Sequence, residues 1–195
     1  MQQIELELEG GGVLTVSLRA SLDAMPAVKE RPLVLVVPGG GYDHVSPREG
    51  DPVALQFAAA GYHTAVLTYS VGEGAQNYRP LRQLNEALAL LRQNAGEWHI
   101  LPDKIAVCGF SAGGHLALSA AVLNIPGETA QQRPNAVILG YPVVTAGEFA
   151  HRGSFVRLAG SEDAAAQQAF TLEDKVTSDT PPVFVWHTME DKTVP

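Results

Sequence analysis

The residues best suited to do chemistry in this 195-residue sequence are residues 109–113, which read Gly-Phe-Ser-Ala-Gly. A serine in this setting can attack a carbonyl carbon when it lies on a sharp turn between a strand and a helix. The glycines two positions before and after it are needed because side chains there would collide within the turn. An aliphatic run precedes the motif and an apolar helical pattern follows it. The pattern therefore predicts that Ser111 is a nucleophile and that the N–H of Ala112 faces a developing oxyanion.

Two further loops follow apolar runs. Residues 38–42 read Pro-Gly-Gly-Gly-Tyr after the run at 33–37, and His187 and Asp191 follow the run at 182–186. Continuous aliphatic runs are typical of parallel strands that are buried on both faces. The carboxyl ends of such strands share one edge of the sheet. We therefore expect both loops to lie near Ser111.

The remaining patterns predict the elements that position these loops. The alternating residues 4–9 and 13–18 predict a hairpin of edge strands, and residues 20–31 a surface connection. Buried strands are expected at residues 33–37, 63–69, 104–108, 135–139 and 182–186. Helices are expected from Asp51 as N-cap to Gly61, from Pro80 to Gly96, and from the serine turn to Leu123. Residues 143–180 have weak periodicity, apart from a short helix at 164–170, and predict a cap-like excursion. Strands alternating with helices predict a three-layer α/β fold with a mixed, mostly parallel sheet, forming one domain over residues 1–195.

Composition excludes several classes of function. The formal net charge of −8 comes from scattered acids and argues against nucleic acid and anionic membranes as partners. The single cysteine, Cys108, lies in an apolar run and is expected to be a packed thiol. There is no apolar run of about 20 residues and no basic signal region, which predicts a cytoplasmic protein. Metal-binding spacings and the lysine of a phosphate loop are missing, so neither a metal nor a cofactor is expected.

On three motifs the sequence resembles the α/β-hydrolase superfamily, and more narrowly its esterase/lipase and acetyl-xylan-esterase-like carboxylic ester hydrolases. The motifs are residues 38–42, residues 109–115, and residues 185–187 leading to Asp191, in the order nucleophile then acid. The resemblance covers nearly the whole chain from Leu33 onward. It implies an α/β-hydrolase fold and a serine esterase that forms an acyl-enzyme.

The resemblance also implies roles for particular residues. The glycine-rich loop would supply oxyanion N–H groups from Gly40 or Gly41, together with Ala112. The acid of the triad would be Asp191, in preference to Glu190. Lipases and esterases often have His-Gly-Gly-Gly in this loop, where this chain has proline in the first place. The backbone N–H donors of the loop are unaffected by this difference, but any contact that the histidine makes in those enzymes is lost.

The catalytic base is the missing part. In the family, the base is a histidine several tens of residues after the acid, whereas this chain ends four residues past Asp191. His115 lies on the first turn after the serine and is expected to be a structural residue, or one that contacts the catalytic residues without touching the substrate. His187 is the nearest substitute for the base. We expect that the C-terminal part of the fold is missing because the chain is truncated; the other explanation is a complete protein that has lost its base.

The sequence thus predicts a carboxylic ester hydrolase that acts on small acyl esters, with acetylated carbohydrates as one class. The alternative is a non-catalytic hydrolase-like binding protein that lacks the base. Peptidase or lactonase specificity with the same triad stays open. The excursion contributes candidate pocket residues: Phe149, His151, Phe155 and Leu158. An open sheet edge after residue 186 favours a homo-oligomer.

Overall fold

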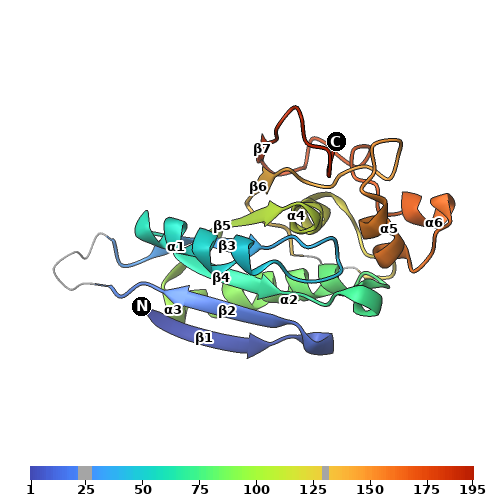
Figure 1. Cartoon of the computed structure of the whole chain (residues 1–195). Helices are drawn as coiled ribbons and strands as arrows, with labels where there is room; N and C mark the ends of the chain where they lie inside the picture. Colours follow the sequence, from blue (N-terminus) through green and yellow to red (C-terminus); the bar gives the residue numbers. More distant parts are fainter. Residues whose placement is uncertain (22–27, 129–131) are drawn as a thin grey trace.

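A mixed seven-stranded sheet forms the centre of the computed structural model, which describes residues 1–21, 28–128 and 132–195 (Figure 1). The strand order is β1-β2-β4-β3-β5-β6-β7. The two antiparallel pairs are β1 with β2 and β2 with β4, and all other pairs are parallel. The strands are β1 (Gln2–Glu7), β2 (Val13–Leu18), β3 (Arg31–Val37), β4 (His63–Thr68), β5 (Ile100–Phe110), β6 (Ala136–Gly140) and β7 (Val183–Trp186).

Helices cover both faces of this sheet. The helices are α1 (Asp51–Ala59), α2 (Arg79–Gln93), α3 (Ala95–Trp98), α4 (Ala112–Val122), α5 (Arg152–Ala159) and α6 (Ala164–Gln168). Short 3₁₀ helices are η1 (Glu9–Gly11), η3 (Pro47–Glu49) and η4 (Gly72–Ala75). Leu33, Leu35 and Val37 of β3 pack in the larger core with α2 and α4, whereas Val34 and Val36 pack in a smaller core with α1. The predicted three-layer arrangement is confirmed.

Helix α4 lies at the centre because it is apolar on all sides. Its residues from Ala112 to Ala121 are all buried, between the sheet and α2. A helix that is apolar all round must be covered all round. This position fixes the N-terminus of α4 directly behind Ser111.

Several predicted boundaries differ in the structure. Strand β2 is not an edge strand, because it pairs with β1 on one side and β4 on the other. Gly50, not Asp51, is the N-cap of α1. Gly96 lies inside α3, and the left-handed residue that ends this helical region is His99, with φ of 54°.

The cap-like excursion also departs from the sequence prediction, because α5 was not predicted. Helix α6 falls within the predicted 164–170. Residues 22–27 of the predicted surface connection lie outside the described part of the chain.

Strand β7 was predicted to be buried, and that prediction is wrong. Its residues are 39 to 62% exposed, because within the described residues β7 pairs only with β6. Along β7, Val183 and Val185 alternate with Phe184 and Trp186, so both faces of this edge are apolar. An exposed apolar edge strand is a template for pairing with another chain.

If copies of the chain pair through β7, as we propose below, Phe184→Lys should shift the protein toward monomer, because a lysine on an edge strand opposes strand pairing. Sedimentation velocity over a range of concentrations measures this shift. The matched control is Leu55→Lys, since Leu55 is 53% exposed on α1, away from the edge. Equal effects of the two variants would show that β7 is not the association surface.

No helix in the described ranges is both long and apolar enough to cross a membrane.

Candidate active site

Ser111 lies at the junction of β5 and α4 in a backbone conformation that side chains rarely adopt, with φ of 52° and ψ of −120°. The glycines on either side of Ser111 leave no room for side chains in this turn. A Cβ on Gly109 would lie 2.2 Å from the carbonyl oxygen of Gly113, and a Cβ on Gly113 would lie 2.1 Å from that of Val37. Only glycine fits at both positions. Strained backbone of this kind persists where the surroundings hold it in place, as functional sites often do.

The loop after β3 and the start of α4 both carry backbone N–H groups that have no acceptor among the described residues. The loop after β3 turns tightly around Gly40, whose carbonyl oxygen accepts the N–H groups of Asp43 and His44 at 3.0 and 3.2 Å. Within the described part of the chain, the N–H groups of Gly40, Gly41 and Ala112 have no hydrogen-bond acceptor. Ala112 is the first residue of α4, so the positive end of the helix dipole lies at the same place. Gly40 and Gly41 line the same cavity as Ser111, and Ala112 follows Ser111 directly.

A cavity of about 560 Å³ opens over Ser111. Of the catalytic and oxyanion residues predicted from the sequence, Ser111, Gly40, Gly41 and Asp191 line this cavity, and Ala112 is buried. The other lining residues are Asp43, His44, Ser46, Arg48, Glu49, Tyr141, His151, Arg157, Thr193 and Val194. The structure thus brings together loops that follow β3, β5, β6 and β7.

Asp191 is held by the backbone that follows it. Its Oδ1 accepts the N–H groups of Val194 at 2.9 Å and Thr193 at 2.8 Å. These two hydrogen bonds lower the pKa of Asp191, in the order Val194 then Thr193, so the carboxylate stays ionised at neutral pH. In the described residues its Oδ2 accepts no hydrogen bond. That oxygen is free to bind a further donor.

His115 cannot reach Ser111 as a base, because both of its ring nitrogens are engaged in the core. Nδ1 lies 2.9 Å from the Tyr42 hydroxyl, and Nε2 lies 2.8 Å from the carbonyl oxygen of Phe170. A carbonyl oxygen only accepts, so Nε2 carries the proton and the hydroxyl donates to Nδ1. Burial lowers the pKa of His115 to about 4. His115 therefore connects α4 to the loops before and after it as a neutral, structural residue.

His187 lies outside the cavity of Ser111. It is exposed, its Nδ1 donates to the carbonyl oxygen of Thr188 at 2.8 Å, and it lines a separate cavity with Val143 and Val185. Across the described residues, no histidine nitrogen is hydrogen-bonded to Ser111 or to Asp191. The described site therefore has a serine, donors and a carboxylate in one cavity.

This geometry agrees with what comparison of the chain with known proteins finds. A family model described as BD-FAE matches residues 23–195. The chain belongs to the BD-FAE family.

Curated and solved relatives of this BD-FAE protein support the same conclusion. It is 35% identical over 177 residues to the endo-1,4-beta-xylanase B of Butyrivibrio fibrisolvens, covering 85% of this chain and 28% of that protein. It is 30% identical over 168 residues to the acetylxylan esterase of Xylanibacter ruminicola, covering 83% of this chain and 34% of that protein. The chain thus spans about a third of the length of these curated relatives.

Among solved structures, it is similar to MGS-M1, an α/β hydrolase enzyme from a Medee basin deep-sea metagenome library. The TM-score is 0.81 at 40% identity, over 100% of this chain and 72% of that one. The BD-FAE chain has the α/β-hydrolase fold, as the sequence resemblance implied.

Of the four pocket residues expected from the excursion, only His151 lines the cavity of Ser111. Phe155 is fully buried and packs edge-on against His115, and Leu158 is buried as well. Phe149 is exposed beside the cavity of His187. Phe155 and Leu158 belong to the core because α5 is amphipathic and turns both residues inward.

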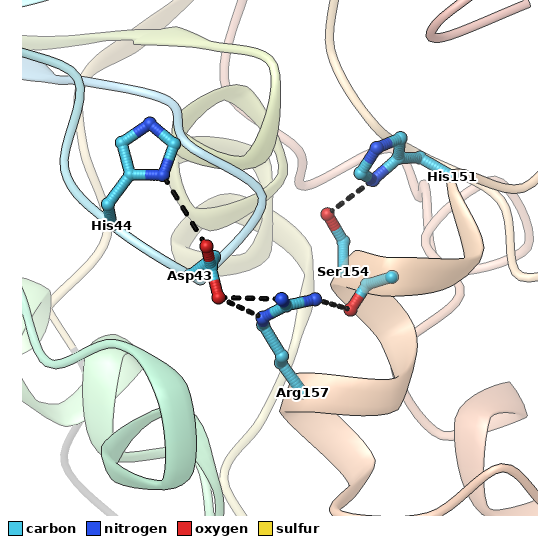
Figure 2. Close-up of polar contacts among 6 residues, drawn as sticks. Asp43, His44, His151, Ser154 and Arg157 are labelled. Atoms are coloured by element: carbon cyan, nitrogen blue, oxygen red, sulfur yellow. Dashed lines mark hydrogen bonds and ion pairs between the residues drawn. The ribbon is translucent and has the colours of Figure 1, made fainter.

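A polar cluster from α5 and the glycine-rich loop forms the rim of the cavity (Figure 2). Arg157 donates from Nη2 and Nε to Asp43 Oδ1 at 2.6 and 2.9 Å, and this pair lowers the pKa of Asp43. The Ser154 hydroxyl lies 2.9 Å from His151 Nδ1. Within the described residues, this nitrogen is the only acceptor for that buried hydroxyl. When the hydroxyl donates to Nδ1, the other ring nitrogen of His151 carries the proton and is an N–H donor.

Sequence reasoning missed Glu49 and Tyr141. Tyr141 follows Gly140 at the end of β6, so its position after an aliphatic run could have indicated the sheet edge. Glu49 lies in η3, and nothing in its local sequence indicates the site.

Proposed function

We propose that this BD-FAE chain carries the nucleophile of a carboxylic ester hydrolase that acts on small acyl esters through an acyl-Ser111 intermediate. The observation that carries this proposal is the strained Ser111, which shares one cavity with free N–H donors and the Asp191 carboxylate. Strain at the serine and preorganised donors are what acyl transfer needs, since charge develops on the carbonyl oxygen during attack.

In this proposal, Ser111 Oγ attacks the ester carbonyl carbon and its proton passes to a base. The negative charge that develops on the carbonyl oxygen is stabilised by N–H groups of Gly40 or Gly41 and Ala112. The alcohol leaves with a proton as the acyl-Ser111 ester forms, and water then hydrolyses that ester. Asp191 would orient and stabilise the protonated base through its free Oδ2. Within the described residues no histidine nitrogen is hydrogen-bonded to Ser111 or Asp191, so the proposal assigns the base to no particular residue.

The substrate class that we propose is an acetyl ester of a carbohydrate. The cavity rim is polar, with donors from Arg48, Arg157 and His151 and acceptors from Asp43 and Glu49, which suits a hydroxyl-rich alcohol. The acetylxylan esterase relative supports the same class. Partners proposed for the chain are this small-molecule ester and a second copy of the chain through β7.

The alternative is a binding protein that keeps the cavity without turnover. It is favoured by the hydrogen bonding of the histidines: within the described residues none of them is hydrogen-bonded to Ser111, and His115 is committed to the core. Such a protein would bind acetylated sugars without releasing acetate.

A fluorophosphonate probe distinguishes the two functions, because phosphonylation uses the same nucleophile and oxyanion donors as acyl transfer. We expect the probe to label the peptide that contains Ser111, as read by mass spectrometry, and Ser111→Ala to abolish that adduct. Turnover of p-nitrophenyl acetate, measured in parallel, is expected to fall in the same variant. Equal turnover with and without the serine would rule out the proposed mechanism.

A further inference from the structure

The Glu49 carboxylate lies between the loop that follows β3 and the loop that follows β6. It is half-buried at the end of η3, and each of its oxygens accepts one hydrogen bond. Oε2 accepts the backbone N–H of Gly39 at 2.8 Å, and Oε1 accepts the hydroxyl of Tyr141 at 2.9 Å. Gly39 follows β3 and Tyr141 follows β6, so one side chain joins the ends of two strands that flank β5.

The same carboxylate lies beside the nucleophile. A Cβ on Gly39 would be 2.8 Å from Glu49 Oε2, 3.0 Å from Ser111 Cβ and 2.7 Å from the carbonyl oxygen of Phe110. Glu49 and Ser111 thus approach the Gly39 backbone from neighbouring positions. Gly39 is the residue directly before Gly40 and Gly41. A contact that fixes the Gly39 peptide therefore also fixes the direction of the Gly40 and Gly41 N–H groups.

Tyr141 is itself firmly held. Its backbone has φ of 38°, its N–H donates to the carbonyl oxygen of Trp186 at 2.7 Å, and its ring packs against Phe110 and Trp186. Burial, followed by the hydrogen bond and charge of Glu49, raises the pKa of Tyr141 to about 12. The phenol therefore keeps its proton at neutral pH and remains a donor to Glu49. The hydrogen bond from Tyr141 therefore holds the Glu49 carboxylate against a rigid side chain.

We infer that Glu49 is a positioning residue for the ester hydrolase reaction, fixing the Gly39 peptide and the Tyr141 phenol so that the Gly40 and Gly41 N–H groups stay aimed at the cavity beside Ser111. This inference rests on the proposed function. Glu49 neither attacks the substrate nor transfers a proton; it acts through the glycine-rich loop. Hydrogen bonds to a carboxylate are stronger than those between neutral groups, which suits a clamp at a solvent-facing edge.

Kinetics of two variants test the role. Glu49→Ala leaves the Gly39 N–H and the Tyr141 hydroxyl without this acceptor, and kcat is expected to fall about 100-fold with KM changed much less, as for a small misplacement of catalytic groups. Glu49→Gln can accept from Gly39 and donate to the phenol oxygen, so it should recover most of the lost kcat. Glu162→Gln, at an exposed glutamate between α5 and α6, is the control. Melting temperatures of all variants separate loss of fold from loss of positioning.

Two kinetic outcomes would overturn the inference. If Glu49→Gln loses as much kcat as Glu49→Ala, the charge and not the clamp matters. If Glu49→Ala retains kcat, the loop does not depend on Glu49.

A second measurement does not depend on turnover. In protein labelled with ¹³C at tyrosine Cζ, the Tyr141 signal, assigned with Tyr141→Phe, should titrate at lower pH in Glu49→Gln than in the parent, because the neighbouring negative charge is gone. An unchanged titration would show that the contact is not made in solution and would overturn the inference. If Ser111→Ala leaves turnover unchanged while this titration shifts, the proposed function fails and the clamp stands as a structural contact only.

Discussion

Replacing Gly113 with alanine is expected to destabilise the fold by about 4 kcal/mol, at the upper end of single-residue effects. The new Cβ would lie 2.1 Å from the carbonyl oxygen of Val37 and 2.3 Å from that of Pro38. Both are backbone atoms at the carboxyl end of β3, and β3 lies between β4 and β5 in the sheet. They cannot move aside without disturbing the centre of the sheet. The helix that carries the serine would have to shift instead.

Urea denaturation, followed by the midpoint and slope of the transition, measures this loss. The matched control is Gly96→Ala, since a Cβ on Gly96 in α3 would meet no atom within 4 Å. That variant should be stabilised by about 0.5 to 1 kcal/mol, because alanine in a helix loses less conformational entropy than glycine. A Gly113→Ala protein as stable as the parent would contradict the close approach of α4 to β3.

The parts of the fold that sequence predicted are those in which local pattern and final environment agree. The run at 33–37 is aliphatic throughout, and β3 is buried on both faces. The helix after the serine is apolar on all sides and lies at the centre. β7 has the same kind of run, and the same pattern predicted burial wrongly. Whether a strand is covered depends on its neighbours, which a run of aliphatic residues does not specify.

The residues of the site also divide into those that local sequence predicts and those that it does not. The glycines around Ser111 could be predicted because the constraint is local, within two residues of the serine. The bonding of His115 could not, since its partners Tyr42 and Phe170 lie 73 and 55 residues away in the chain. Glu49 meets Tyr141 across 92 residues. Such contacts exist only once β3, β5 and β6 are side by side, so no local sequence motif can predict them.

The glycine-rich loop provides the second large effect. Gly40→Ala is expected to slow both ester turnover and phosphonylation of Ser111 by about 10²- to 10³-fold, the usual cost of losing an oxyanion donor. Gly40 has φ of 126°, and a Cβ there would lie 2.1 Å from the carbonyl oxygen of His44. The substitution must therefore open the turn in which this glycine's carbonyl accepts the N–H groups of Asp43 and His44. The neighbouring N–H groups would then point elsewhere.

Gly11→Ala is the matched control for this loop variant. Gly11 also has a positive φ, of 91°, but a Cβ there would meet nothing within 4 Å, and it lies between β1 and β2, away from the cavity. The two variants share the cost of a left-handed alanine, while only Gly40→Ala disturbs the donors. Their labelling rates should therefore differ by the full oxyanion effect. Equal labelling rates would show that Gly40 and its turn do not contribute to the oxyanion site. The Ala112 N–H at the start of α4 would then be the donor to test.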